Sequence, residues 1–145
     1  MSLLTFERMS SSPYSLGMAC DFLARFPPFN DYEFGVMTKS LLYQLESGSH
    51  LVAGIEDRIV GYVGWISTTR AIAEAWLEHD APLLPAFEAI DALAVTILAT
   101  EDTRYILPLI KQAKLRNLGH SVYWKRHFSD GRLAGKRAVR KRTTE

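Results

Sequence analysis

One carboxylate lies inside the most apolar stretch of the chain. Residues 86–100 read AFEAIDALAVTILAT, and Asp91 stands between Ile90 and Ala92. An unpaired carboxylate costs several kcal/mol to bury, so a group in this position is usually paired, half exposed or kept for chemistry. A carboxylate that faces a reaction site can orient or deprotonate a partner group. The structural alternative is an aspartate at a strand end that accepts hydrogen bonds from the backbone or pairs with an arginine.

Four histidines are the other candidates for acid–base chemistry. His50 stands at the start of a hairpin pattern, His79 in a loop and His120 just after a helix stop, which are positions typical of surface or capping residues. His127 alternates with Lys125 on one face of a strand and is the histidine best placed for function. No pair of histidines has the spacing of a zinc site with a third ligand, and the GxxxxGK[ST] and GxGxxG patterns are absent. The sequence therefore predicts no metal site and does not favour nucleotide hydrolysis or dinucleotide binding.

Charge is distributed unevenly along the chain. Residues 1–110 carry six basic and fourteen acidic residues, a net charge of −8, whereas residues 111–145 carry eleven basic and two acidic residues, a net charge of +9. A cationic segment attracts phosphates or an acidic protein partner by steering. Nucleic acid is not the expected partner, because the acidic remainder of the chain would oppose a phosphate backbone.

Length and composition predict a single soluble domain over residues 1–145, with residues 1–10 and 142–145 frayed. Acidic residues interrupt the longest apolar run before it reaches the length of a membrane span, and the first residues make a poor secretory signal. We therefore expect a cytoplasmic protein. The lone Cys20 excludes an internal disulfide and is expected to be a small core residue.

Apolar spacing and turn formers predict the elements that position these residues. Helices are expected over residues 10–25, 34–46, 69–78 and 102–119, hairpins over 50–68 and 121–141, and a buried strand over 87–100. Asp102 or Thr103 would cap the last helix, and Pro108 implies that it starts late or is kinked. This order of elements is typical of an α/β sandwich built mainly on antiparallel neighbours.

Three segments carry a resemblance to the RTX toxin-activating lysine acyltransferases, also called hemolysin-activating acyltransferases. LVAGIEDRIVGYVGWIST resembles the central hairpin of that family, FEAIDALAV its Phe-Ile-Asp-Trp-Ile strand, and AGKRAVRK its late Gly-Lys-Val strand. The resemblance runs from about Phe26 to Lys141. It implies an α/β, N-acetyltransferase-like (GNAT-related) fold with a mixed, mainly antiparallel sheet flanked by helices.

The resemblance also implies a reaction. In that family, acyl chains pass from an acyl carrier protein to an internal lysine of a protoxin, and a His and an Asp are the essential pair. Asp91 matches the Asp, whereas the Ser-x-x-His segment falls on FPPFND and places Phe29 at the histidine. Because Phe29 cannot take a proton or form an acyl intermediate, His127 or Asp31 would have to replace the base. Otherwise the chain has lost the transfer and retains binding.

Two groups of site residues follow from the resemblance. The acyl or substrate site is expected to be lined by Phe29, Gly61, Gly64 and Trp65. This fold splays two neighbouring strands so that a pantetheine arm can bond to their backbone, and glycines permit such a close approach. The segment of net charge +9 is complementary to an acyl carrier protein or to the phosphates of coenzyme A. Its expected carrier-binding side chains are Lys125, Arg126, Lys136 and Arg137.

The donor expected from the sequence is acyl-acyl carrier protein, with acyl-CoA as the alternative. TEDTRYILP, from Thr100 onwards, puts acids and no glycine where the phosphates of coenzyme A would dock in ordinary N-acetyltransferases. The expected function is transfer of a fatty acyl group to a protein lysine, for example of an RTX-type toxin, without a tightly bound cofactor. The alternatives are a non-catalytic module that binds an acyl carrier or a partner protein, and an acetyl-CoA-dependent N-acetyltransferase. A homodimer would match the habit of the family.

Overall fold

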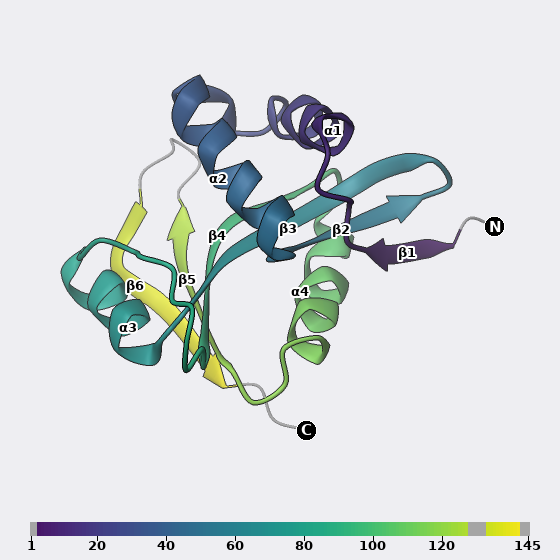
Figure 1. Ribbon diagram of the computed structural model, residues 1–145. Coiled ribbons are helices and arrows are strands. Elements are labelled where there is room, and N and C mark those ends of the chain that lie inside the picture. The colour runs from purple at the N-terminus through teal and green to yellow at the C-terminus, as the bar shows by residue number, and fades with distance from the viewer. Residues whose placement is uncertain (1–2, 128–132, 143–145) are drawn as a thin grey trace. The chain divides into compact units, whose positions relative to one another are not determined.

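The computed structural model describes residues 3–127 and 133–142, and the side chains of residues 3–125. The strands are β1 (Leu4–Glu7), β2 (His50–Ile55), β3 (Arg58–Thr68), β4 (Ala92–Thr100), β5 (Ser121–His127) and β6 (Leu133–Arg142). The helices are α1 (Pro13–Leu23), α2 (Phe34–Ser47), α3 (Arg70–His79) and α4 (Ile106–Leu115), with 3₁₀ turns η1 (Phe29–Asp31) and η2 (Thr103–Tyr105). Within the described residues, the strands are hydrogen-bonded in the order β1-β2-β3-β4-β5-β6 (Figure 1).

The chain divides into two compact units, each built from two separate segments. The first unit comprises Met1–Gly64 and Ile97–Ala113, and the second comprises Trp65–Thr96 and Lys114–Glu145. Strands β3 and β4 both run from one unit into the other. Neither unit is therefore a continuous piece of the chain, and a single domain over residues 1–145 stays a prediction.

The first unit contains a strand that the sequence does not predict. Residues 4–7, expected to be frayed, form β1 and pair antiparallel with β2, from Leu4 opposite Ile55 to Glu7 opposite Val52. Four residues are too few to show a clear alternation of apolar and polar side chains. The segment is extended because it pairs with the free edge of β2. The next two strands form the predicted hairpin around Glu56 and Asp57.

The first unit contains α1, α2 and most of α4, and the predicted helices α1 and α2 are confirmed. The Ser12 side chain caps α1 by accepting the Ser15 N–H, and Pro13 occupies the first turn, where a missing N–H costs nothing. Gly48 ends α2 in the left-handed conformation. Apolar side chains from both helices, η1 and the strands form the core cluster of Ala19, Phe22, Leu23, Phe29, Met37, Leu41, Val52, Tyr62, Ile97 and Ala99.

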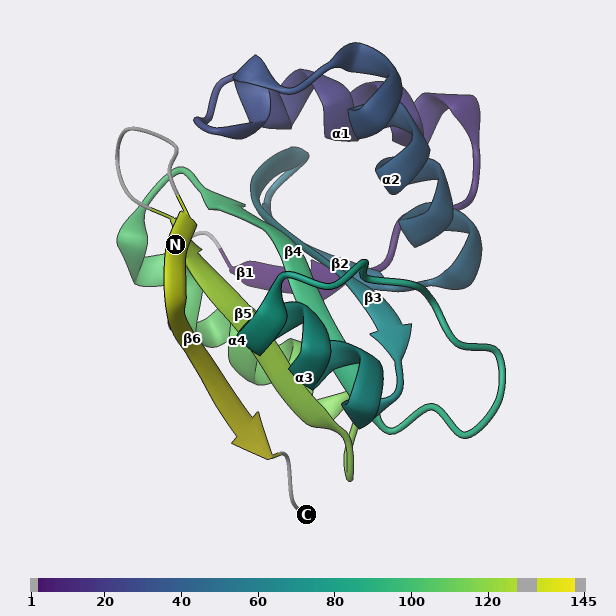
Figure 2. The ribbon, with the colours of Figure 1, turned by 90° about the vertical axis from the view of Figure 1, so that its left-hand side faces the viewer.

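The second unit holds the parallel strand pair. Strand β4 runs parallel to β5, with Ala92–Val95 opposite Ser121–Trp124, and β5 is antiparallel to β6. Helix α3 lies alongside β5 and β6 (Figure 2) and packs Ala73 and Leu77 against the strands. The sheet is therefore mixed and mainly antiparallel, with flanking helices, as predicted. No helix in the described part of the chain is long and apolar enough to cross a membrane.

The buried strand predicted over residues 87–100 begins only at Ala92. Phe87 is 86% exposed, and Ala89 has a φ of 54°, which an extended strand does not allow. Asp91 therefore lies directly before the strand and not in its middle. The helix predicted over residues 102–119 is shorter as well, because α4 starts only after the 3₁₀ turn η2 and ends at Leu115.

Candidate functional site

Asp91 occupies a capping position at the start of α3. Its Oδ1 accepts the backbone N–H of Arg70, the first residue of α3, at 2.8 Å. Its own N–H donates to the Thr68 carbonyl at 3.2 Å, and its carbonyl accepts the Ser121 N–H at 2.9 Å. A carboxylate at the N-terminus of a helix is stabilised by the free N–H groups and by the helix dipole. The half-buried Asp91 is thus paired with backbone, which is the structural alternative that the sequence left open.

Polar groups of the second unit continue from Asp91 into β5. The Arg70 Nε donates to Oγ of the fully buried Ser121 at 3.1 Å. His120 directly precedes Ser121, whose N–H is bonded to the Asp91 carbonyl, so the His120 backbone lies near Asp91. His127 ends β5 opposite Leu133, and its side chain is outside the described residues. The proposed pairing of Asp91 with His127 therefore stays a prediction.

His50 is a buried structural residue, so a surface position for it was wrong, whereas its ring does cap a carbonyl in the last turn of α2, as the alternative had it. Its Nε2 accepts the Met9 N–H at 2.9 Å, and its Nδ1 lies 2.9 Å from the Gln44 carbonyl. Since a carbonyl only accepts, the proton lies on Nδ1 and the ring is neutral. Burial lowers the pKa of His50 and favours the same neutral form. Among the described residues, no three His, Cys, Asp or Glu side chains lie together as a metal site requires.

The close approach expected at Gly61 and Gly64 exists, and the approaching groups belong to the chain itself. A Cβ added to Gly64 would lie 2.0 Å from the Gln44 Oε1, and one added to Gly61 would lie 3.2 Å from the Thr100 Cγ2. Gln44 is held there because its Oε1 accepts the Tyr62 hydroxyl at 2.7 Å. Both side chains are fully buried, and burial raises the pKa of Tyr62. The glycines make room for this internal packing.

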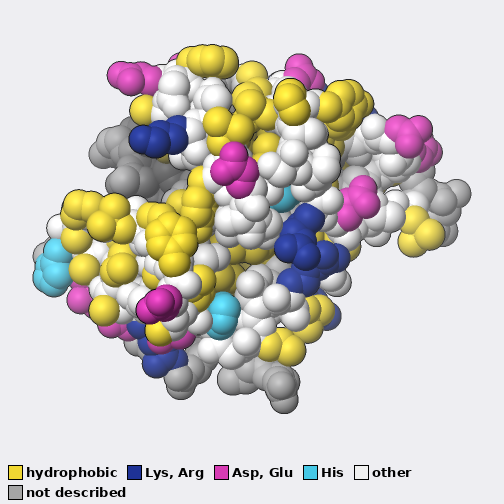
Figure 3. Space-filling model, in the orientation of Figure 1, with side chains coloured by type: hydrophobic (Ala, Val, Ile, Leu, Met, Phe, Trp, Pro, Cys, Tyr) yellow, Lys and Arg dark blue, Asp and Glu magenta, His cyan; other side chains and the backbone are white. Residues whose placement is uncertain are grey.

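Phe29 lines an apolar cavity in the first unit. The cavity has a volume of about 220 Å³ and lies between the end of α1, η1 and the start of α2. Its walls include the side chains of Cys20, Leu23, Phe29, Tyr32, Met37 and Thr38. Burial raises the pKa values of the Cys20 thiol and of Tyr32, which keeps both groups protonated. Exposed apolar side chains, including those of Phe34 and Val36, gather on the same helices (Figure 3).

The remaining predicted site residues have different environments. Trp65, expected in the acyl site, is a buried residue of β3 in the second unit. The Lys125 side chain is only 5% exposed, with its Nζ 2.8 Å from the Asp80 Oδ1 and 4.6 Å from the centre of the Trp76 ring. Its hydrogen bond lowers the pKa of Asp80. Lys125 is therefore neutralised inside its own unit, which does not favour a carrier contact. The side chains of Arg126, Lys136 and Arg137 lie outside the described residues.

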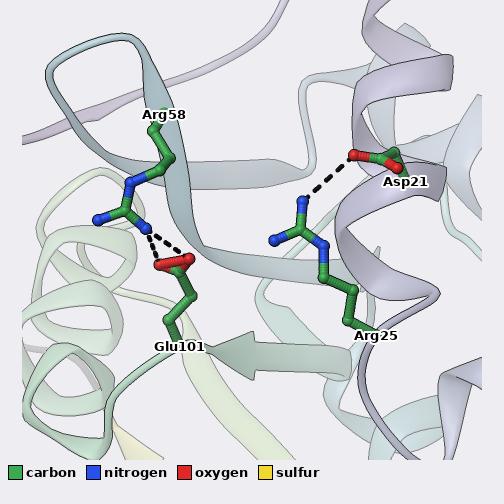
Figure 4. A network of polar contacts seen from close by, with 4 residues as sticks. All are labelled: Asp21, Arg25, Arg58 and Glu101. Carbon is green, nitrogen blue, oxygen red and sulfur yellow. Dashed lines mark hydrogen bonds and ion pairs between the residues drawn. The ribbon is translucent and has the colours of Figure 1, made fainter.

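The turn between β4 and α4 is the expected phosphate position. The Asp102 Oδ1 accepts the Arg104 N–H at 2.9 Å, and its Oδ2 lies 3.2 Å from the Arg104 Nε. These bonds lower the pKa of Asp102, and the bond from the Arg104 backbone N–H has the largest effect. Arg58, at the start of β3, points at Glu101 and forms an ion pair with it (Figure 4). The residues present do not fit a diphosphate, since carboxylates already take the Arg104 N–H and the side chains of Arg58 and Arg104.

Comparison with known proteins identifies the fold. No family model matches the chain, and no curated protein matches it in sequence. Among solved structures it is similar to a Drosophila melanogaster polyamine N-acetyltransferase, with 16% identity and a TM-score of 0.59 over 87% of this chain and 77% of that chain. It is similar to the GNAT-like decarboxylase GphF in complex with isobutyryl-CoA, with 16% identity and a TM-score of 0.64 over 88% and 67%.

A third solved structure, the loading GNATL domain of CurA from Lyngbya majuscula, has 11% identity and a TM-score of 0.59 over 86% of this chain and 65% of that domain. Likeness at such identities reports the fold and leaves the reaction open, because related folds carry different chemistries. The chain therefore has the GNAT fold of the N-acetyltransferases, as the sequence predicted.

Proposed function

We propose that this protein is an acyltransferase-like protein of the toxin-activating type, which takes a fatty acyl group from an acyl carrier protein and transfers it to a protein lysine. In that transfer, the lysine amine attacks the thioester carbonyl, a C–N bond forms, the C–S bond breaks, and the thiol leaves with a proton. The observation that carries the proposal is the apolar cavity beside Phe29 in a chain with the GNAT fold.

The cavity suits the hydrocarbon part of an acyl donor. Its volume of about 220 Å³ exceeds the ~150 Å³ of an engineered apolar cavity that binds benzene. Each methylene moved from water into such a space contributes about 0.8 kcal/mol of binding free energy. Phe29, which stands where the resembling family has its histidine, adds apolar wall to this space. Phe29 in place of the histidine therefore makes the cavity wall less polar, which favours the binding of an acyl chain.

Thioester chemistry is supported by the neighbours at the level of the fold. One of them is a decarboxylase in complex with isobutyryl-CoA, and another is a loading domain. Their activities differ, so the fold alone does not select among acyl transfers. The acetyl-CoA-dependent N-acetyltransferase remains an alternative through the polyamine N-acetyltransferase.

A non-catalytic binding module is the second candidate, and the position of Asp91 favours it. Its Oδ1 is engaged by the Arg70 N–H, so a purely structural role explains why the carboxylate is there. In this reading the cavity beside Phe29 still binds an acyl carrier or a partner protein, and no bond is made or broken.

Two substitutions at Asp91 separate these candidates. Asp91→Asn keeps an oxygen that can accept the Arg70 N–H but cannot take a proton, whereas Asp91→Ala removes both properties. We would measure free-thiol release from a medium- or long-chain acyl-acyl carrier protein, together with the thermal stability of each variant. A catalytic Asp91 predicts that Asp91→Asn is stable and loses release.

Other outcomes of this experiment have equally definite meanings. Release that survives in Asp91→Asn and falls with stability in Asp91→Ala would make Asp91 a positioning residue. Salt-sensitive carrier binding without release in the wild type would favour the binding module. Absence of both binding and release would overturn the acyl carrier proposal.

A further inference from the structure

Several backbone donors of the turn between β4 and α4 are engaged within the chain. A phosphate binds at the start of a helix through N–H groups that no other acceptor takes. Here the Glu101 N–H donates to the Val60 carbonyl at 2.9 Å, and the Arg104 N–H donates to the Asp102 Oδ1 at 2.9 Å. The Tyr105 N–H donates to the Asp102 carbonyl at 3.0 Å. These donors are therefore engaged by the chain where a phosphate would need them.

The side chains at this turn oppose a diphosphate as well. Glu101 and Asp102 place two carboxylates next to each other, with side chains 26% and 40% exposed. Arg58 is paired with Glu101 (Figure 4), and Arg104 is paired with Asp102. An incoming diphosphate would meet like charge, and it would have to displace a carboxylate from each arginine before it could bind that arginine.

We propose that Glu101 and Asp102 occupy the place that a diphosphate would take at this turn, so that the protein accepts acyl thioesters without a diphosphate in preference to acyl-CoA. Asp102 acts as an internal anion, because it receives both the backbone N–H and the guanidinium of Arg104. The substrate named here rests on the proposed acyl transfer. The exclusion of the diphosphate rests on the geometry of the turn alone.

A double substitution tests the exclusion without dismantling the turn. In Glu101→Gln/Asp102→Asn, the asparagine keeps an oxygen for the Arg104 N–H, while Arg58 and Arg104 lose their carboxylate partners. The matched control is Glu56→Gln/Asp57→Asn, which changes the net charge equally on the turn between β2 and β3. The probes are inorganic pyrophosphate, octanoyl-CoA and octanoyl-pantetheine, with affinity measured by titration calorimetry and thiol release measured in parallel.

In the wild type we expect octanoyl-CoA and octanoyl-pantetheine to bind within about threefold of each other, because the diphosphate gains no contact. The double variant should gain at least about tenfold in affinity for pyrophosphate and octanoyl-CoA, and nothing for octanoyl-pantetheine. The control should change each affinity by less than about twofold, because its charges lie outside the turn that would hold the phosphates.

Two results would overturn the inference. One is wild-type binding of octanoyl-CoA more than about tenfold tighter than octanoyl-pantetheine, and the other is a double variant with no gain for pyrophosphate. If the double variant gains pyrophosphate affinity while neither thioester binds or releases thiol, the exclusion of the diphosphate stands and the proposed acyl transfer fails.

Discussion

A buried histidine joins three segments of the first unit. His50 connects the backbone at Met9, before α1, to the end of α2 at Gln44 and to the start of β2. A protonated ring would have no acceptor left for the Met9 N–H, so both hydrogen bonds require the neutral form. Since burial lowers the pKa of His50 in the folded protein, the unfolded chain binds more protons just below the ordinary histidine pKa of about 6.5.

The free energy of unfolding should therefore fall as the pH drops below about 6.5. His50→Gln removes the titrating ring and should flatten this dependence, which urea unfolding at a series of pH values would measure. His79→Gln is the matched control, because the His79 side chain is 77% exposed, and it should leave the dependence as in the wild type. Equal dependence in the wild type and His50→Gln would contradict the assignment.

Gly64 has no room for a side chain, since the buried Gln44 fills the space beside it. Gly64→Ala should destabilise the protein by about 1–3 kcal/mol, because the Gln44 amide must move and its bond to Tyr62 is lost. In a double-mutant cycle measured by chemical denaturation, Gly64→Ala with Gln44→Ala should cost less than the sum of the single changes.

The same substitution in α1 provides the control for Gly64. Gly17 has no atom within 4 Å of an added Cβ, so Gly17→Ala should raise stability by up to about 1 kcal/mol through helix propensity. Additive costs at Gly64 and Gln44 would show that the two positions do not share their space.

At the scale of elements, the start of α3 depends on two side-chain acceptors. The Thr69 Oγ1 accepts the Ile72 N–H at 3.3 Å, and Asp91 accepts the Arg70 N–H. Thr69→Ala and Asp91→Ala should each lower the free energy of unfolding by about 1 kcal/mol, as measured by denaturant titration. A cost for Thr69→Ala with none for Asp91→Ala would mean that the helix does not need the carboxylate, and it would favour a role in chemistry.

Elements that are bounded by helix-stopping or turn-forming residues were predictable from the sequence. The Pro-Pro stop after α1, Gly48 after α2 and the polar turn of the first hairpin each have a local physical reason that letters reveal. Strand β1 and the start of β4 lacked such signals. The first depends on a partner strand, and the second on a left-handed residue, Ala89, that no propensity marks.

The candidate site was predictable only in part. The unusual position of Asp91 is visible in the sequence, but its hydrogen bond comes from residues far along the chain. The burial of His50 was missed, because both of its partners are backbone groups and leave no mark in residue types. The burial of Lys125 is not visible in the sequence, because its partners Trp76 and Asp80 lie in and directly after α3, far from it along the chain.

At the scale of the molecule, the net charge of +9 over residues 111–145 is the feature that would attract an acidic carrier. Lys136→Glu with Arg137→Glu should weaken binding of an acyl carrier protein and reduce its dependence on salt, as measured by calorimetry at two ionic strengths. Lys125→Met should leave carrier binding unchanged, because that ammonium is already paired and buried. If Lys125→Met weakened carrier binding more than Lys136→Glu with Arg137→Glu, the assignment of Lys125 to internal packing and of the other two cations to the carrier would be wrong.

The interleaving of the two units along the chain has a consequence for synthesis on the ribosome. The first unit needs Ile97–Ala113, which emerge only after the whole of Trp65–Thr96 has been made. The residues of that stretch, which include α3 and the apolar start of β4, are therefore made before either unit has all of its own residues. Only then do residues from Lys114 onwards arrive to supply the strands on which α3 packs.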